Sequence, residues 1–172
     1  MFSKAQQLPA PAIYFAEFSS RIGKIQLRGT TTALTGVFME KHRYEPARPV
    51  GAVRDAGPLR SAQQELEEYF EGERREFSVA LAPAGTPFQM RVWQELRTIP
   101  YGETISYLDL AQRVGSPRAF RAVGQANGHN PISIIVPCHR VIAADGALGG
   151  YGGGLERKRI LLALEKVTTK AG

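Results

Sequence analysis

The sequence predicts an α/β (α+β) fold in two parts, a strand-rich N-terminal α/β domain at residues 1–82 and a mainly helical C-terminal domain at residues 83–172. Short β-rich segments separated by turn residues fill most of the first part. Amphipathic helical spacing dominates the second part, and the linker-like stretch APAGT at residues 82–86 separates the two. With 172 residues, 43% of them hydrophobic, the chain can bury one core or two small cores that share an interface.

The N-terminal domain is expected to combine strands with a single helix. The helix carries an apolar stripe that includes Leu66 and Tyr69, and Gly72 is expected to end it. A loop rich in Pro, Gly and Ala precedes this helix. The expected elements are strands at 13–18, 22–28 and 33–39, the loop at 43–58, the helix at 59–71 and a further strand at 77–81.

The C-terminal domain begins with a predicted helix that Thr86 caps, with Pro87 at its first position. A second helix follows the break IPYGET. Its apolar positions recur at i, i+3, i+4 and i+7, and they are Tyr107, Leu110, Ala111 and Val114. After the turn GSP, Ser116 is expected to cap a third helix with Pro117 at its first position. The apolar stripe of this helix is Ala119, Ala122, Val123 and Ala126.

The second and third helices, joined by a short turn that contains glycine, have the form of a helix-turn-helix. The third helix turns Arg118, Arg121 and Gln125 to one face, where they can reach phosphates or base edges. An ordinary helical hairpin with a solvated arginine face is the alternative. The formal net charge of +6 and the pI of about 9.7 favour anionic partners, with nucleic acid first and an anionic membrane second, although a merely solvated basic surface is also compatible with them.

The lone cysteine points to a reducing, cytoplasmic setting. One cysteine cannot form an internal disulfide, the first twelve residues lack the apolar stretch of a signal peptide, and the apolar runs are too short to span a membrane. We therefore expect a cytoplasmic protein that does not enter the membrane.

Cys138 is a candidate nucleophile at the end of an apolar strand. Pro137 interrupts strand pairing just before it, and His139 and Arg140 place positive charge nearby, which predicts a thiol pKa below its ordinary value. Neighbouring residues in an extended chain point to opposite faces, so His139 can reach the sulfur only through a water molecule. An inert, buried cysteine is the alternative. The chain's one cysteine and three histidines show no spacing typical of zinc ligands.

Three further features accompany the cysteine. Glu165, at the edge of the stripe of a helix expected at 155–166, is a candidate partner that orients the histidine, with a charge at the surface end of the helix as the alternative. Asn130-Pro131 is a turn signal. The tract DGALGGYGGG at 145–154 is either a flexible surface loop or a loop whose backbone closes on a flat ligand with Tyr151 as its wall.

The stretch IPYGETISYLDLAQRVGSPRAFRAVGQANGHNPISIIVPCHRVI, followed by GYGGGLERKRILLALE, closely resembles the O6-alkylguanine-DNA alkyltransferases. The resemblance runs almost continuously over residues 85–165, with the Asn-Pro, Pro-Cys-His-Arg and Tyr-x-Gly-Gly elements in the family's order and spacing. Residues 1–82 resemble the family's variable N-terminal domain only in size and strand content. The resemblance implies direct-reversal DNA repair, in which an alkyl group moves irreversibly from guanine O6 to the protein's cysteine, once per molecule.

The family's mechanism assigns roles to residues of this sequence. The helix-turn-helix would bind the minor groove of double-stranded DNA, and the damaged nucleotide would flip into a pocket. The implied catalytic set is Cys138 as the acceptor thiolate, His139 as the base acting through a water molecule, Glu165 as its orienting carboxylate and Asn130 as a hinge. The implied substrate-binding set is Tyr107 at the 3′ phosphate, Tyr151 as a donor to the guanine N3 side, Gly152, and Val141, whose backbone with that of Cys138 reads the exocyclic amine. The implied DNA-binding set is Arg121, which fills the vacated space, with Arg118, Gln125 and Ser116.

Two departures and three alternatives accompany the resemblance. Many relatives have Ser where this chain has Gly152, which predicts a roomier pocket that accepts larger alkyl groups, and the absence of cysteine from residues 1–82 predicts no structural zinc. No cofactor is implied, and a monomer is expected. O4-alkylthymine as a second substrate and cooperative binding along DNA are left open.

The alternatives are a damage sensor without transfer activity, which Cys138 argues against, a helix-turn-helix regulator, and a Cys-His hydrolase unrelated to DNA.

Overall fold

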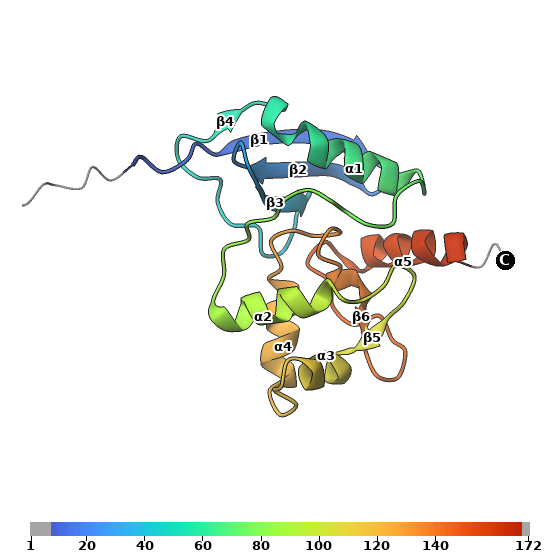
Figure 1. Cartoon of the computed structure of the whole chain (residues 1–172). Coiled ribbons are helices and arrows are strands. Elements are labelled where there is room, and N and C mark those ends of the chain that lie inside the picture. The colour runs from blue at the N-terminus through green and yellow to red at the C-terminus, as the bar shows by residue number, and fades with distance from the viewer. Residues whose placement is uncertain (1–7, 170–172) are drawn as a thin grey trace, which may run out of the picture.

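A four-stranded sheet and one helix form the N-terminal part of the computed structural model, which describes residues 8–169, and four helices form most of the C-terminal part (Figure 1). The strand order is β3-β2-β1-β4, with β1 antiparallel to β2, β2 antiparallel to β3, and β4 parallel to β1. The elements are β1 Tyr14–Ser20, β2 Gly23–Gly29, β3 Leu34–Met39, β4 Val53–Arg54, the 3₁₀ helix η1 Gly57–Leu59, α1 Arg60–Phe70, α2 Pro87–Leu96, β5 Ile105–Ser106, α3 Tyr107–Arg113, α4 Phe120–Gly128, the 3₁₀ helix η2 Cys138–Arg140, β6 Val141–Ile142 and α5 Leu155–Thr169.

The three predicted N-terminal strands are confirmed within two residues at each end. Strands β1 and β2 form a tight hairpin in which Ser20 pairs with Gly23. Gly23 has a φ of +97°, a conformation that glycine adopts without a steric penalty, and the Ser20 hydroxyl donates to its carbonyl at 2.8 Å. The predicted helix at 59–71 is also confirmed as η1 followed by α1, which lies over β1 and β2 (Figure 1).

The strand predicted at 77–81 is wrong. Only Leu81 pairs, in an isolated parallel bridge with Leu34. The side chain of Glu65 on α1 takes the backbone N–H groups that a strand would use, because its Oε2 accepts from the N–H of Ser78 at 2.9 Å and of Val79 at 3.3 Å. A buried carboxylate needs such donors, so the segment runs as a loop across the helix.

The C-terminal helices begin where the sequence predicts, with one exception. Thr86 and Gln89 form a capping box at the start of α2, with Pro87 at the first helical position. Helix α4 instead begins at Phe120, with Ala119 at its N-cap, so Ser116 does not cap it. The Ser116 carbonyl instead accepts from the Ala119 N–H at 2.9 Å. This bond closes a separate turn, so the helix starts only after it.

The apolar stripe of α4 is narrower than the sequence predicts. Val123 and Ala126 are buried as expected, but Ala122 is exposed. Asn127 takes the third buried position instead, and at about 100° per residue Ala122 lies about 90° from the centre of the stripe formed by Val123, Ala126 and Asn127.

The N-terminal sheet directly holds the segment that carries Cys138. Val37 on β3 donates to the carbonyl of Pro131 at 2.9 Å, and its carbonyl accepts from Ser133 at 3.3 Å. Arg157 on α5 adds a second link, donating to the carbonyls of Ile22 at 2.8 Å and Glu40 at 2.7 Å. One continuous apolar core therefore spans both parts of the described chain.

Replacing Arg157 with Ala is expected to lower the free energy of unfolding by about 1–3 kcal/mol, because its partly buried carbonyl partners lose their donors. Urea denaturation followed by circular dichroism measures this change. Arg159→Ala is the matched control on the same helix, since the Arg159 side chain is 61% exposed and pairs with Glu156 at the surface. It should change the value by less than about 0.5 kcal/mol. Equal effects of the two substitutions would contradict the role given to Arg157.

Candidate functional site

Cys138 lies buried at the start of η2, with only 4% of its surface exposed. The segment before it is not the predicted strand. Ile132 pairs with Val37 and Ser133 with Val136 in isolated bridges, and Ile134 has a φ of +74°. The chain therefore turns sharply between Ser133 and Val136, and the cysteine follows a tight, buried loop instead of a strand.

The thiol pKa contradicts the expectation of an acidic cysteine. Burial raises the pKa of Cys138 to about 11, although a hydrogen bond with Asn130 and the charge of Lys158 act in the opposite direction. Arg140, which the sequence placed beside the sulfur as a positive neighbour, turns its guanidinium to Glu165 instead. In the free protein the thiol is therefore protonated near neutral pH.

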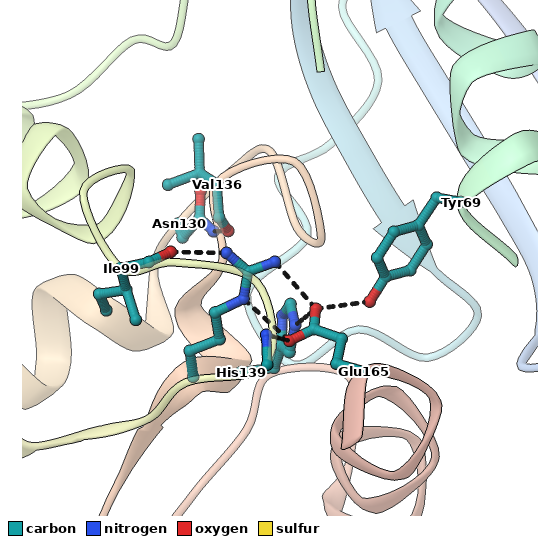
Figure 2. Close-up of polar contacts among 8 residues, drawn as sticks. Tyr69, Ile99, Asn130, Val136, His139 and Glu165 are labelled. Atoms are coloured by element: carbon teal, nitrogen blue, oxygen red, sulfur yellow. Dashed lines mark hydrogen bonds and ion pairs between the residues drawn. The ribbon is translucent and has the colours of Figure 1, made fainter. Parts of the chain in front are cut away.

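Glu165 is the centre of a buried polar network (Figure 2). Its Oε1 lies 2.7 Å from Nε2 of His139 and accepts from the Tyr69 hydroxyl at 2.8 Å. Arg140 binds the carboxylate in a bidentate manner, at 2.9 and 3.0 Å. Although burial opposes ionisation, His139 and Arg140 together lower the pKa of Glu165 to about 2. A carboxylate only 1% exposed is no surface charge, so that alternative is wrong.

His139 is completely buried and neutral. Burial lowers the pKa of its imidazole, and this effect is larger than the raising effect of Glu165. Since the Glu165 carboxylate can only accept, the proton of the neutral ring lies on Nε2. Its Nδ1 then carries a lone pair and has no hydrogen-bond partner within residues 8–169. The ring therefore presents a free basic nitrogen inside the core.

Asn130 connects the end of α4 to the Cys138 segment. Its Oδ1 accepts from the Ile132 N–H at 3.0 Å, and its Nδ2 donates to the Val136 carbonyl at 2.7 Å. The first bond is the simple turn that the sequence predicts. The second closes the buried loop, and the side chain also lowers the pKa of the Cys138 thiol.

Two residues of the predicted substrate-binding set, Tyr107 and Val141, meet around Lys158, which the sequence prediction missed. The Tyr107 hydroxyl donates to the Gly150 carbonyl at 3.3 Å. Nζ of Lys158 donates to the carbonyls of Val141 at 2.6 Å and Gly150 at 3.1 Å, and also to that of Leu148. Lys158 is fully buried, and burial lowers its pKa to about 8. Its position three residues before the buried Leu161 on α5 was the available signal.

Tyr151 and Gly152 begin the turn that leads into α5. Burial raises the pKa of Tyr151 well above its ordinary value, and its hydroxyl has no partner meeting hydrogen-bond geometry among the described residues. The expected extra room at Gly152 is absent. A Cβ there would lie 2.7 Å from Cε1 and 2.8 Å from Nε2 of His42, so an imidazole from the N-terminal part already fills the space.

The predicted DNA-binding residues lie at or just before α4. Arg118, Arg121 and Gln125 are exposed, and Ser116 is half-buried in the preceding turn. Phe120, at the start of the helix, is 52% exposed. These side chains form a basic, accessible face, compatible with both the helix-turn-helix and the plain hairpin.

Residues 8–169 contain neither a candidate metal centre nor a candidate membrane-spanning helix. No three His, Cys, Asp or Glu side chains converge in a way that would hold a metal ion. None of the described helices combines the length and apolar character needed to cross a membrane. The first seven residues, on which the leader-peptide expectation partly rests, lie outside the described range.

Comparison with known proteins identifies relatives over almost the whole chain. The chain is 53% identical over 154 residues to the methylated-DNA--protein-cysteine methyltransferase of Mycobacterium bovis, which covers 90% of this chain and 93% of that protein. It is 49% identical to the corresponding protein of Methanosarcina acetivorans, over 89% of this chain and 98% of the relative. A crystal structure of Mycobacterium tuberculosis OGT in complex with DNA superimposes with a TM-score of 0.87 at 52% identity, covering 90% of this chain and 94% of that chain.

Two family profiles match consecutive parts of the sequence. The ribonuclease-like domain of 6-O-methylguanine DNA methyltransferase matches residues 13–83, and the DNA binding domain of the same family matches residues 87–167. The chain belongs to the 6-O-methylguanine DNA methyltransferase family.

Proposed function

We propose that this protein repairs DNA by direct reversal, transferring the alkyl group of O6-alkylguanine in double-stranded DNA to Cys138. The observation that carries the proposal is the buried Cys138, next in sequence to a neutral histidine that Glu165 orients and whose second nitrogen is free. The relatives named as methylated-DNA--protein-cysteine methyltransferases, and the DNA complex of one of them, support it.

The proposed transfer is a single displacement. His139 Nδ1 takes the thiol proton through a water molecule, and the Cys138 thiolate attacks the alkyl carbon. The S–C bond forms as the C–O6 bond breaks, and its electron pair leaves on guanine. A proton from Tyr151 neutralises the departing base. The thioether has no leaving group that water can displace, so each molecule acts once.

The high pKa of the resting thiol fits such a single-use reagent. At a pKa of about 11, only about one molecule in ten thousand carries the thiolate near pH 7. Because the sulfur is protonated and buried, it reacts slowly with electrophiles other than the substrate. We propose that the bound nucleotide and the His139 relay together shift this equilibrium. The protein is therefore expected to need its DNA substrate for fast reaction.

The remaining roles follow the family resemblance. We propose that α3 and α4 bind the minor groove, that Arg121 fills the space of the flipped nucleotide, and that Arg118, Gln125 and Ser116 contact the duplex. Tyr107, Tyr151, Gly152 and Val141 would line the nucleotide pocket, and Asn130 would act as the hinge. Residues 1–82 and 83–172 are proposed as the two domains. The acceptor thiol needs a reducing compartment, which favours the cytoplasm.

The central prediction concerns covalent transfer. After incubation with a duplex containing O6-methylguanine, the protein should gain the mass of one methyl group, and peptide mapping should place it on Cys138. Intact-protein mass spectrometry measures the gain, and Cys138→Ser should show none. Tight binding to the damaged duplex with no added mass would support a lesion sensor instead and refute the proposed reaction.

A second prediction separates nucleotide flipping from chemistry. Arg121→Ala is expected to slow transfer from the duplex by about 10-fold or more, because the vacated space collapses without a substitute side chain. Transfer from the free O6-alkylguanine base, which needs no flipping, should change by less than about twofold. Arg159→Ala, at an exposed arginine of α5 outside the proposed DNA-binding set, is the control and should leave both rates unchanged. Equal slowing with both substrates would show that Arg121 supports the pocket itself.

A third prediction concerns acid stability. The pKa of Glu165 is lowered on folding, so its stabilising effect is complete above the ordinary value of 4.5 and is lost as pH falls from there towards about 2. Urea denaturation across this window should show a loss on the order of 3 kcal/mol in the wild type from this group. Glu165→Gln should unfold more easily at neutral pH and show a flatter pH dependence. Glu156→Gln, at a carboxylate 75% exposed, controls for the removed charge; an unchanged slope in Glu165→Gln would contradict the assignment.

A further inference from the structure

His42 and Gly152 are complementary in shape although 110 residues separate them. A side chain at position 152 would overlap the His42 ring, and its Cβ would also lie 3.3 Å from the carbonyl of Gly128. Gly152 is not among the glycines with positive φ, so its backbone does not demand glycine. The glycine is therefore required by the imidazole packed against it. A backbone bond from the N–H of Arg43 to the Gly152 carbonyl, at 2.8 Å, holds the two segments together.

The hydrogen bonds of His42 define which nitrogen carries its proton. The backbone N–H of Tyr44 donates to Nδ1 at 3.4 Å, so Nδ1 is an acceptor. In the neutral ring the hydrogen then lies on Nε2, which is 3.4 Å from the hydroxyl oxygen of Ser133. Burial and the nearby Arg157 guanidinium lower the pKa of His42 to about 4, which keeps the ring neutral near pH 7.

Ser133 connects this histidine to the nucleotide pocket. Its side chain is fully buried, and its hydroxyl oxygen accepts from His42, so its own hydrogen is available for another acceptor. Burial raises the pKa of Tyr151, and the Ser133 hydroxyl acts in the opposite direction. The Tyr151 hydroxyl, also buried, has no hydrogen-bond partner within the described chain, so it lacks a donor.

We propose that His42 is a positioning residue for alkyl transfer, which packs against Gly152 and orients the Ser133 hydroxyl so that it donates to Tyr151. The donors then run in one direction, from the Tyr44 N–H to His42, from His42 to Ser133 and from Ser133 to Tyr151. The phenol hydrogen is left for the departing guanine. The N-terminal part thereby contributes a side chain to the function of the site. This inference rests on the proposed transfer reaction.

Single-turnover methyl transfer from an O6-methylguanine duplex to the full-length protein, quenched and followed by intact mass, tests the relay. His42→Phe fills the same space without a donor and is expected to slow transfer at least about fivefold, with the Kd for the duplex and the Tm little changed. His42→Gln, whose amide can donate to Ser133, should stay within about twofold of the wild type. An undiminished rate in His42→Phe, or equal slowing in both variants, would overturn the proposal. Lys41→Gln, at the exposed preceding residue, is the matched control.

The packing part of the proposal has its own test. Gly152→Ala is expected to lower the Tm because its Cβ overlaps the imidazole, and His42→Ala in the same chain should recover most of that loss. Additive effects of the two substitutions would show that the residues do not share this space.

Nitrogen-15 NMR of the histidine rings tests the hydrogen-bond direction without any reaction. His42 should be neutral at pH 7 with its proton on Nε2, and Ser133→Ala should shift the Nε2 signal. A proton on Nδ1, or a signal indifferent to Ser133→Ala, would refute the relay. A wild-type protein that accepts no methyl group would refute the proposed function, while the NMR result would still decide the relay.

Discussion

The structure of the site depends on one buried carboxylate. Glu165, on the last helix, binds His139 and Arg140 from η2 and Tyr69 from α1, so three distant segments meet at two oxygen atoms. A buried charge is costly unless each lone pair has a donor, and removing one partner leaves that cost uncompensated. The fold can therefore bury this carboxylate only when all three segments are in place, and the same arrangement fixes the ring of His139.

Burial also sets the protonation state of the proposed nucleophile, Cys138. Exposed cationic neighbours would acidify Cys138 but would also open it to indiscriminate electrophiles. Here burial keeps the thiol protonated, and the Arg140 guanidinium binds Glu165. The lone pair of His139 Nδ1 lies within the same core. Under the proposed reaction, the thiol would become reactive only once a bound nucleotide and the His139 relay shift its protonation.

Much of the fold could be predicted from local patterns, and the residues proposed for the site from the family resemblance. Turn residues mark the three N-terminal strands, and the Thr86-Pro87 pair marks α2, since these signals act over a few residues. The failures have non-local causes. The Glu65 carboxylate accepts hydrogen bonds from backbone N–H groups of the strand expected at 77–81. A turn at Ser116 makes α4 begin later than predicted. The burial of Glu165, the pKa of Cys138 and the filling of the space at Gly152 all depend on residues at least 25 positions away in the sequence or on desolvation, which no spacing rule records.

Contacts between the two parts suggest a structural role for the N-terminal part, which is to hold the site in place. The proposed chemistry centres on Cys138 and His139, yet contacts with the N-terminal part hold the surrounding geometry. Tyr69 binds the Glu165 carboxylate, β3 pairs with the loop before Cys138, and Arg157 binds the carbonyls of Ile22 and Glu40. Two of these links anchor α5, and the third anchors the buried loop before Cys138. Because these links are spread over the sheet and its helix, substitutions far from Cys138 can change the site without touching any residue of its motif.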